Sequence, residues 1–335
     1  DHTDRENYPV VFWSWLIMTV ILTSTLTLFV IHTILWLFRE TIHLLFRKKA
    51  EVHAPAAGGV RYIRRYSRWH RVTHLLVVVS FLGLVATGIP LKYSYTEWAH
   101  TLMDAVGGYQ VAGFLHRVCA VMTGVYVVMH LIWLVYYYVR VRRRTVFRSI
   151  FGPNSMLLRW KDLKDMVNHV RWFLFLGPRP KFDRWTYWDK ADYWGEYWGV
   201  TIIGSTGLLL WFPDFFSRFL PGWIFNVAIV VHSIEALLAA SIIFLVHFFN
   251  VHLRPSKFPL DTVIFTGSIP EEEFIEEHPL EYQRLKELGQ LESRIERPRS
   301  VGFRVSVYLF GIAAFLFGLF LMALLIKTEW RNFFG

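Results

Sequence analysis

The residues of this chain that can do chemistry are its histidines, 14 in number, several of them within strongly apolar stretches. A polar imidazole inside hydrocarbon is costly unless it is paired or bound to a metal. Neutral imidazole is also the commonest protein ligand for metals. The single cysteine, Cys119, excludes an internal disulfide, a cysteine-ligated iron–sulfur cluster and a C-x-x-C-H site for covalent cofactor attachment. Something other than cysteine must therefore hold any cofactor, and the histidines are the obvious supply.

The composition indicates that much of the chain lies in the hydrocarbon of a membrane. Residues of the AVILMFWYC set make up 54% of the 335 residues and charged residues only 19%, whereas soluble domains carry roughly 25% charged residues. The mean hydropathy is +0.34. The 15 tryptophans suit a chain that meets lipid headgroups at many places. A soluble enzyme, a disordered chain and a secreted disulfide scaffold are excluded, and a membrane protein is predicted.

Six stretches are long and apolar enough to cross a hydrocarbon core of about 30 Å, which takes about 20 helical residues. They are 9–38, 72–91, 111–139, 192–211, 223–251 and 302–326. We therefore expect an all-α integral membrane protein with about six transmembrane helices.

The distribution of positive charge predicts the orientation. The stretch 39–71 carries nine Lys or Arg against two acids, and 140–190 carries thirteen against four. The loops 92–110 and 212–222 each hold one basic residue. By the positive-inside rule both basic stretches are cytoplasmic, as is 252–300, and both termini lie outside. Topology and anionic lipid thus account for the net charge of +10, and nucleic acid is set aside as a partner.

Two cytoplasmic segments have structure of their own. From Met156 to Val167, apolar residues recur at helical spacing against a basic face, which predicts an interfacial helix on the membrane. The charged stretch from Glu271 to Glu296 predicts a short helix pair or a docking arm, whose charges most simply form a solvated face. We find no internal repeat.

The membrane histidines occur at two levels. His116 and His130 are 14 residues apart in the third span, nearly on one face and about 21 Å apart along the helix. His232 and His247 are 15 residues apart in the fifth span, about 22 Å apart and turned by about 60°. With the topology above, His116 and His232 lie near the outer side, and His130 and His247 lie near the inner side. His74, close to the cytoplasmic start of the second span, also lies near the inner side.

Imidazoles offered at two levels by antiparallel helices are what a pair of stacked b-type haems needs, because two axial histidines can grip each non-covalent haem in a bundle core. Electrons can then cross the membrane from one haem to the other. A histidine-lined proton or solute transporter without haem is the alternative, but it predicts interrupted helices around a midplane site, which these histidines avoid. A passive membrane anchor would not need the paired levels.

Four segments, in order along the chain, resemble the core helices of one family. They are 68–74 (RWHRVTH) with 82–88 (LGLVATG), Leu115-His116-Arg117, 185–198 with 206–213 (TGLLLWFP), and 232–255, which ends in HFFNVHLRP. Over about residues 60–290 the chain resembles the formate dehydrogenase gamma-subunit family of membrane cytochromes b. The resemblance implies a four-helix dihaem cytochrome b in a bacterial inner membrane, which passes electrons between menaquinone or ubiquinone near the cytoplasmic face and a partner on the other side.

The resemblance also implies the haem ligands. His116 and His232 would hold the outer haem, and His74 and His247 the inner one. The 15-residue spacing in the fifth span is one longer than the family pattern, which predicts a local bulge or a different inner partner. His130 is additional.

Two roles stay open for this extra histidine. His130 is an alternative inner ligand, or it holds a third haem together with His32. The expected cofactors are therefore two b-type haems, with a third left open.

The expected organisation follows from the bundle. It comprises a first transmembrane helix with a cytoplasmic linker (1–59), a four-helix cytochrome b core with an amphipathic helix (60–255), a cytoplasmic charged arm (256–300) and a last transmembrane helix (301–335). Substrate chemistry would belong to other subunits of a respiratory oxidoreductase complex, such as a multihaem cytochrome c or an iron–sulfur subunit.

Several charged side chains are candidates for neutralising haem propionates or relaying protons. Arg117 on the outer side, and Arg68 and Arg71 on the inner side, can neutralise haem propionates, because arginine suits bidentate carboxylate pairing. For Arg117, snorkelling to the interface is an equal alternative. Glu235, one turn from the outer histidine of its span, is expected to relay protons, to pair with Arg117 or to bond a neighbouring helix.

Quinone chemistry needs a redox centre within reach and a proton donor or acceptor beside the carbonyl oxygens. The run 187–194 opens the fourth span at the inner level. Lys190, Asp192 and Tyr193 within it are the candidates, with His252 as a further proton partner. The alternative is an ordinary aromatic and charged belt at the membrane surface.

Overall fold

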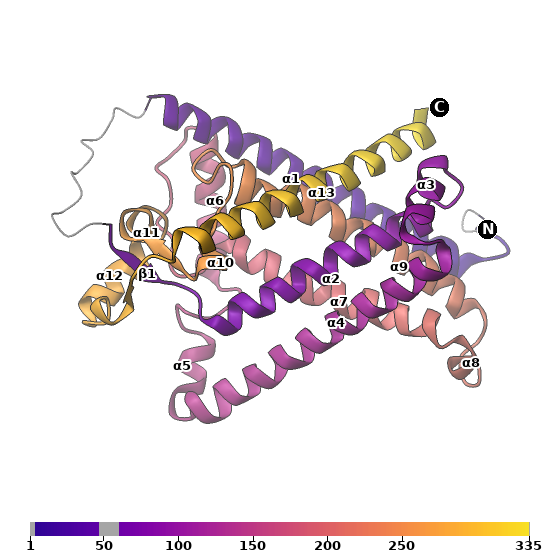
Figure 1. Cartoon of the computed structure of the whole chain (residues 1–335), viewed down its shortest axis with the longest axis horizontal. Coiled ribbons are helices and arrows are strands. Elements are labelled where there is room, and N and C mark those ends of the chain that lie inside the picture. Colours follow the sequence, from indigo (N-terminus) through magenta and orange to yellow (C-terminus); the bar gives the residue numbers. More distant parts are fainter. Residues whose placement is uncertain (1–3, 47–59, 335) are drawn as a thin grey trace.

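A computed structural model describes residues 4–46 and 60–334, so residues 47–59 of the expected cytoplasmic linker lie outside the described residues. Six long helices run lengthwise through the molecule (Figure 1). They are α1 (Pro9–Phe46), α2 (Arg68–Lys92), α4 (Tyr109–Tyr136), α7 (Tyr187–Trp211), α9 (Trp223–Ile242) and α13 (Val301–Phe334). All of them coincide with the predicted spans, and the all-α membrane class is confirmed.

Five of these helices, α4 and α9 counted with the turns that continue them, are long and apolar enough to cross a membrane by length and composition. The sixth, α7, has 25 residues. Four of its first ten residues are charged, which lowers its hydropathy. It packs along α9, and α6 packs against it as well.

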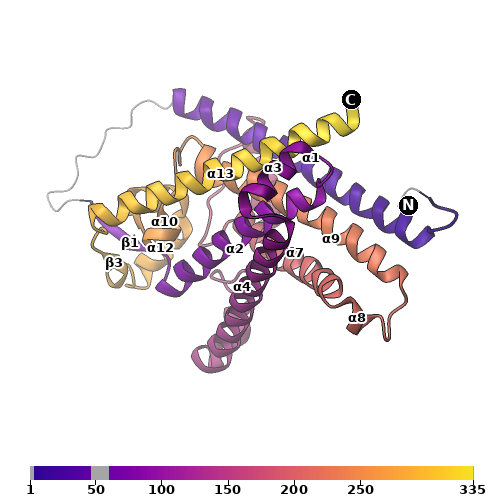
Figure 2. The ribbon, with the colours of Figure 1, turned by 45° about the vertical axis from the view of Figure 1, so that its right-hand side comes forward.

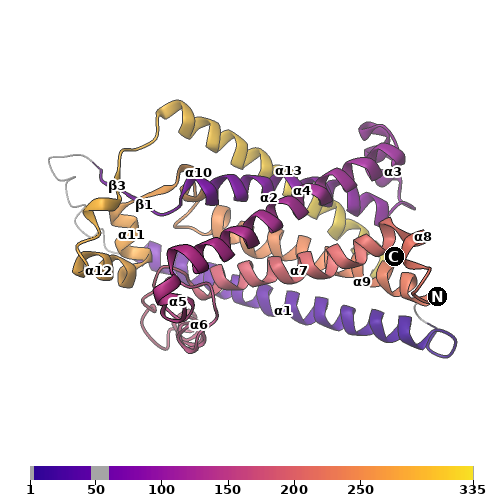
Figure 3. The same ribbon diagram turned by 90° about the horizontal axis from the view of Figure 1, so that it is seen from below.

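The long helices pack in pairs. α2 packs along α4, and α7 along α9, while α1 lies on α9 and α13 on α2. Seen from below, α2 and α4 form one layer and α7 and α9 the next, with α1 along the outer edge (Figure 3). An apolar cluster that includes Val85, Leu237, Phe244 and Leu321 joins α2, α9 and α13. The bundle core is thus built from residues of three different spans.

The fifth span ends in π-helical turns. After α9 the chain continues as η3 (Ile243–His247) and η4 (Phe249–Leu253). A π turn inserts one extra residue into a helix. It therefore absorbs the extra residue between His232 and His247, and the predicted local bulge is confirmed. The third span likewise ends in a π turn, η1 (Tyr137–Val141).

Short elements connect the spans. They are α3 (Glu97–Val106) and α8 (Pro213–Phe216) at one end of the bundle, and η2 (Arg143–Thr145), α5 (Val146–Ile150) and α6 (Trp160–Phe173) at the other. α6 is the expected amphipathic helix, shifted toward the C-terminus. It packs against α1 and α7 and buries Asp162, His169, Trp172 and Phe173, so one of its faces contacts protein.

A small cap closes the end of the bundle expected to be cytoplasmic (Figures 1 and 2). Its antiparallel sheet has the order β2-β1-β3. The elements are β1 (Tyr62–Arg64), β2 (Ser268–Pro270), β3 (Ile295–Glu296), α10 (Val263–Thr266), α11 (Glu271–Glu277), α12 (Pro279–Glu287) and η5 (Glu292–Arg294). The predicted helix pair is confirmed. The sheet was not predicted, because strands of two or three residues are too short to show alternation.

The charges of the cap, expected to form a solvated face, are in part buried and paired. Glu281 is 1% exposed and accepts hydrogen bonds from Arg65 and Arg184, both at 2.7 Å. Arg254 donates to Glu277 at 2.7 Å. The expected solvated face is therefore wrong for these residues, because they pair with arginines that lead into or follow the spans.

The pH dependence of cap stability follows from Glu277. Burial alone would raise the pKa of Glu277, but the charges of Arg254 and Lys257 outweigh burial and lower it to about 2, from an ordinary value of 4.5. A carboxyl with a lowered folded-state pKa stabilises the fold above its unfolded pKa, and this stabilisation is lost on acidification. We expect the Tm to fall between about pH 4.5 and pH 2.

Glu277→Gln should lower stability at neutral pH by about 3 kcal/mol, because it leaves the buried guanidinium of Arg254 without its carboxylate partner. Thermal unfolding of the purified protein measures this. The matched control is Glu292→Gln, whose carboxylate pairs with Arg61 but is 77% exposed, and whose Tm should not change. Equal Tm values for Glu277→Gln and the wild type would contradict the prediction.

Candidate cofactor site

A cavity of about 1610 Å³ lies among α2, α4, α7 and α9. Ordinary small-molecule pockets are about 300–1,000 Å³, so this cavity can take more than one large ligand. His74, His116, His232 and His247 all line it. All four bundle helices contribute residues to the cavity wall. The histidines come from three of the spans, those of α2, α4 and α9.

The outer pair consists of His116 from α4 and His232 from α9. Their ring centres are 6.4 Å apart and their planes are inclined by 61°. Nδ1 of His116 lies 2.9 Å from the hydroxyl of Thr87, and Nδ1 of His232 lies 3.0 Å from the carbonyl oxygen of Ile203. With both Nδ1 atoms engaged, the Nε2 atoms are the ones left for a metal.

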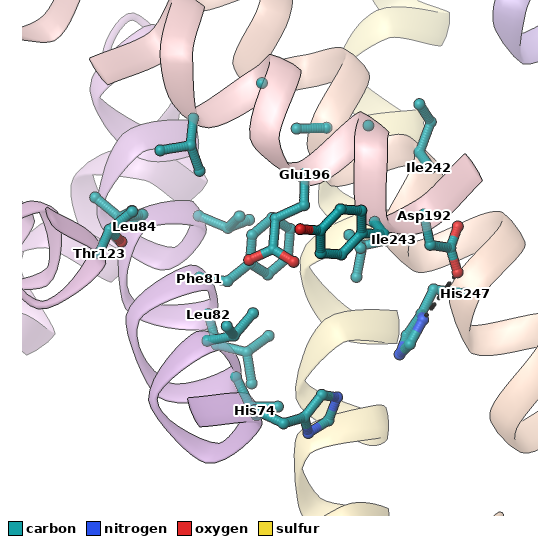
Figure 4. A pocket seen from close by; sticks show the side chains of 18 of the residues that line it. His74, Phe81, Leu82, Leu84, Thr123, Asp192, Glu196, Ile242, Ile243 and His247 are labelled. Atoms are coloured by element: carbon teal, nitrogen blue, oxygen red, sulfur yellow. Dashed lines mark hydrogen bonds and ion pairs between the residues drawn. The ribbon is translucent and has the colours of Figure 1, made fainter. Parts of the chain in front are cut away.

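The inner pair consists of His74 from α2 and His247 from η3. Their ring centres are also 6.4 Å apart, with planes inclined by 38°. Nδ1 of His247 faces a carboxylate oxygen of Asp192 at 3.4 Å, as Figure 4 shows. Nδ1 of His74 is buried and has no hydrogen-bond partner among the described residues. A carboxylate behind a histidine is the usual outer-shell support of a metal ligand.

The separation within each pair would allow its two histidines to hold one metal ion together. Two imidazoles that bind a metal from opposite sides, each through a bond of about 2 Å, have ring centres roughly 6 Å apart. Both pairs meet this condition, and neither has a ring-to-ring hydrogen bond among the described residues. The structure thus brings together the same two pairs that the resemblance implies.

Glycines give the cavity flat walls. Gly113 and Gly124 of α4, and Gly195 and Gly204 of α7, all line it. A Cβ atom built at any of the four would meet nothing within 4 Å. Open space directly against helix backbone suits a flat macrocycle, so the residues present fit one haem at each histidine pair.

His130 and His32 each take another partner. Nε2 of His130 lies 3.0 Å from the hydroxyl of Tyr193, and the ring packs beside Tyr197. Nε2 of His32 lies 2.7 Å from the hydroxyl of Tyr187. The structure therefore does not bring these two histidines together as a third pair.

Of the three arginines expected near propionates, Arg117 alone lines the cavity, where it lies 5.6 Å over the ring of Trp211. Arg68 is exposed, and Arg71 donates to the carbonyl oxygen of Phe265 at 2.6 Å. Neither reaches the cavity wall.

The cations at the inner end of the cavity are instead Arg65, Arg179 and Arg254. The sequence analysis missed them. Arg65 belongs to the same basic run as Arg68, but it follows β1, and the strand turns its side chain toward Glu281. Nothing in the local sequence distinguishes the two arginines.

Lys190 is fully buried in an ion pair. Its Nζ lies 2.9 and 2.8 Å from the two carboxylate oxygens of Asp162 and 3.1 Å from the carbonyl oxygen of Leu157. These contacts occupy the ammonium group and attach α6 to α7. Lys190 is also absent from the cavity wall.

The other quinone candidates do line the cavity. Asp192 and Tyr193 do so from α7 and His252 from η4. Nδ1 of His252 faces the carbonyl oxygen of Pro259 at 3.1 Å, and its ring stacks on Phe315 with centres 4.3 Å apart. Asp192 and Tyr193 each contact a histidine, so both are tied to the inner half of the bundle.

Two further carboxyls lie inside the bundle. Glu235 is 3% exposed, and its Oε2 has no hydrogen-bond partner among the described residues. It lies against Gly199 of α7, while Arg117 lies over Trp211, so the expected pairing of the two charges is not formed among the described residues. Glu196, which the sequence analysis did not single out, points into the cavity in Figure 4 and accepts a hydrogen bond from Tyr126.

Comparison with known proteins agrees with this geometry. Residues 65–257 match the model of the prokaryotic cytochrome b561 family. The match covers more than half of the chain and spans α2 to η4, with both histidine pairs inside it. A comparison with curated proteins gives no match.

The expectation of a membrane cytochrome b is thereby confirmed, at the level of this family. Five apolar helices of sufficient length agree with a multi-pass bacterial membrane protein. The chain belongs to the prokaryotic cytochrome b561 family and is a membrane haem-b electron-transfer protein.

Proposed function

We propose that this chain is the dihaem subunit of a quinone-linked respiratory oxidoreductase, with His116 and His232 on the outer haem and His74 and His247 on the inner one. The observation that carries the proposal is the equal separation of 6.4 Å within two histidine pairs at opposite ends of one cavity. Haem supplies one-electron redox chemistry when bound. The subunit then conducts electrons between two membrane surfaces.

The protein residues give the two sites different surroundings. The outer ligands are backed by neutral oxygen atoms, whereas His247 is backed by the carboxylate of Asp192. A carboxylate partner makes an imidazole a more basic ligand and stabilises the oxidised metal. We therefore infer that the inner site has the lower reduction potential.

The orientation follows from the charge distribution. The start of α1 and the end of α13 lie at the opposite end of the molecule from the cap (Figure 1). Since the described parts of the basic stretches, 39–46, 60–71 and 140–190, adjoin the cap end, we place the cap in the cytoplasm and both termini outside. The inner haem then faces the cytoplasm, and the outer haem faces the partner subunit, such as a multihaem cytochrome c or an iron–sulfur protein.

For the quinone we propose the inner end of the cavity, beside the inner histidine pair. Asp192, Tyr193 and His252 line it and carry groups that can exchange protons with quinone oxygens. Lys190 is left out, because Asp162 and a carbonyl oxygen already hold its ammonium group. The quinone type is menaquinone or ubiquinone, as the resemblance implies.

Haem content tests the ligand assignment. The purified protein should contain two b-type haems per chain by pyridine haemochrome, read against iron. His116→Ala or His232→Ala should remove one haem, and His74→Ala or His247→Ala the other, because a haem with one axial ligand is held weakly. His130→Ala is the control and should keep both. Retention of both haems in the four variants would contradict the assignment, and a folded, colourless wild type would favour the transporter.

Quinol oxidation tests the quinone site. Tyr193→Phe and His252→Gln should each slow haem reduction by quinol about a hundredfold, the scale of a lost proton-transfer partner. Reduction by dithionite should be unchanged, since the haems remain bound. Tyr109→Phe is the control, because that hydroxyl contacts His100 away from the cavity. Unchanged quinol rates in both variants would place the site elsewhere.

A further inference from the structure

A threonine–glycine pair occurs on two different helices of the bundle. Thr87-Gly88 lies on α2 and Thr206-Gly207 on α7. Each pair contacts the outer histidine of the next long helix. His116 follows Thr87 by 29 residues, and His232 follows Thr206 by 26. The two halves of the bundle therefore build the outer site in the same way, although the sequence shows no repeat.

The contacts of Thr87 determine which nitrogen of His116 carries the proton. Oγ1 of Thr87 lies 2.7 Å from the carbonyl oxygen of Gly83, 3.2 Å from that of Leu84, and 2.9 Å from Nδ1 of His116. A hydroxyl has one proton, and a helical threonine donates it to the carbonyl one turn earlier. Its oxygen must then accept from Nδ1–H. The proton is on Nδ1, and the lone pair for a metal is on Nε2.

Thr206 acts on His232 in the same way. Its Oγ1 lies 2.7 Å from the carbonyl oxygen of Ile202, 3.1 Å from that of Ile203, and 3.2 Å from Nδ1 of His232. Nδ1 also lies 3.0 Å from the carbonyl oxygen of Ile203, which can only accept. Two acceptors therefore require the proton on Nδ1 of this histidine as well.

The glycine of each pair makes room for the ring. A Cβ atom at Gly88 would lie 3.2 Å from Cε1 of His116, and one at Gly207 would lie 3.1 Å from Cε1 of His232. Contacts this short force the neighbouring ring to shift, because packed interiors do not absorb an added methyl group freely. In each pair, the glycine thus determines the position of the imidazole ring, and the threonine determines the tautomer of that ring.

The inner histidines are held differently. Nδ1 of His247 faces Asp192, and Nδ1 of His74 has no hydrogen-bond partner among the described residues. The inner site therefore serves as an internal control for changes made at the outer one.

We propose that Thr87-Gly88 and Thr206-Gly207 are positioning residues of the outer site, which fix the tautomer and the place of its two histidines so that both Nε2 atoms face one metal. This inference rests on the proposed function, in which the outer histidine pair holds a haem. The residues act through the histidines and do not touch the metal themselves.

Thr87→Val and Thr206→Val test the role of the hydroxyls, since valine keeps the branched shape and removes the acceptor. We expect the outer haem to remain bound, its midpoint potential to rise and its low-spin EPR signal to shift, because a histidine that loses an acceptor on Nδ1 is a less basic ligand. The shift should be smaller for Thr206→Val, since the carbonyl oxygen of Ile203 still accepts from His232. The inner haem should not change. Thr87→Ser keeps the hydroxyl and should have the wild-type potential.

The control is Thr201→Val on α7, where the hydroxyl donates to the carbonyl oxygen of Tyr197 at 2.7 Å and has no histidine partner within the described part of the chain. Its spectrum should match the wild type. The outer-haem signal is identified as the one that disappears in His116→Ala.

The glycines are tested by Gly88→Ala and Gly207→Ala. Each should lower the occupancy of the outer haem and shift its EPR signal, because the added methyl group displaces one ring. Gly302→Ala on α13, where a Cβ atom would meet nothing within 4 Å, should have no effect.

The outcomes separate this inference from the proposed function. Unchanged potential and EPR signal in both threonine variants, with the outer haem present, would overturn the positioning role alone. Equal shifts of both haems would overturn it too, since the effect would not be local. If His116→Ala and His232→Ala keep both haems, the proposed function fails, and this inference with it.

Discussion

This structure depends on pairs of imidazole rings that face each other across a gap inside an apolar bundle. A polar ring in hydrocarbon must find a partner, and each of the two pairs has its ring centres 6.4 Å apart with no direct hydrogen bond between the rings. The helices must approach closely enough to set this separation and still leave a cavity. Glycines on α4 and α7 meet the second demand, because they leave helix backbone without side chains where the cavity runs along it.

The second constraint is the placement of charge at the cap end. Arg65 precedes α2 and Arg184 precedes α7, and both donate to the buried carboxylate of Glu281. One acid from a distant part of the chain therefore ties together the starts of two bundle helices. Breaking a buried cluster of this kind is costly, since it leaves charge without a partner. The cap thus helps to fix the heights of the histidines that those helices position.

The two ends of the cavity differ in chemistry although their histidine pairs share one separation. Hydroxyl and carbonyl oxygens support the outer rings, whereas a carboxylate supports one inner ring. The π turn at η3 belongs to the same arrangement, because it lets His247 line the cavity despite the longer spacing in its span. In the proposed dihaem function, such differences in outer-shell partners would give the two sites different reduction potentials.

The sequence by itself determined the spans, the two levels of histidine and the class of membrane cytochrome b, because hydropathy and helical periodicity are local properties of the chain. The family model that matches is that of prokaryotic cytochrome b561 and not the formate dehydrogenase gamma-subunit family that the chain resembles. Only the tertiary structure decided which polar groups meet. Lys190 pairs with Asp162, His130 with Tyr193, and Arg65 in place of Arg68 reaches the cavity. These contacts join segments far apart in the chain, and the direction of each side chain depends on how its helix or strand is turned against its neighbours. That rotation is a property of packing, which no single segment of sequence specifies.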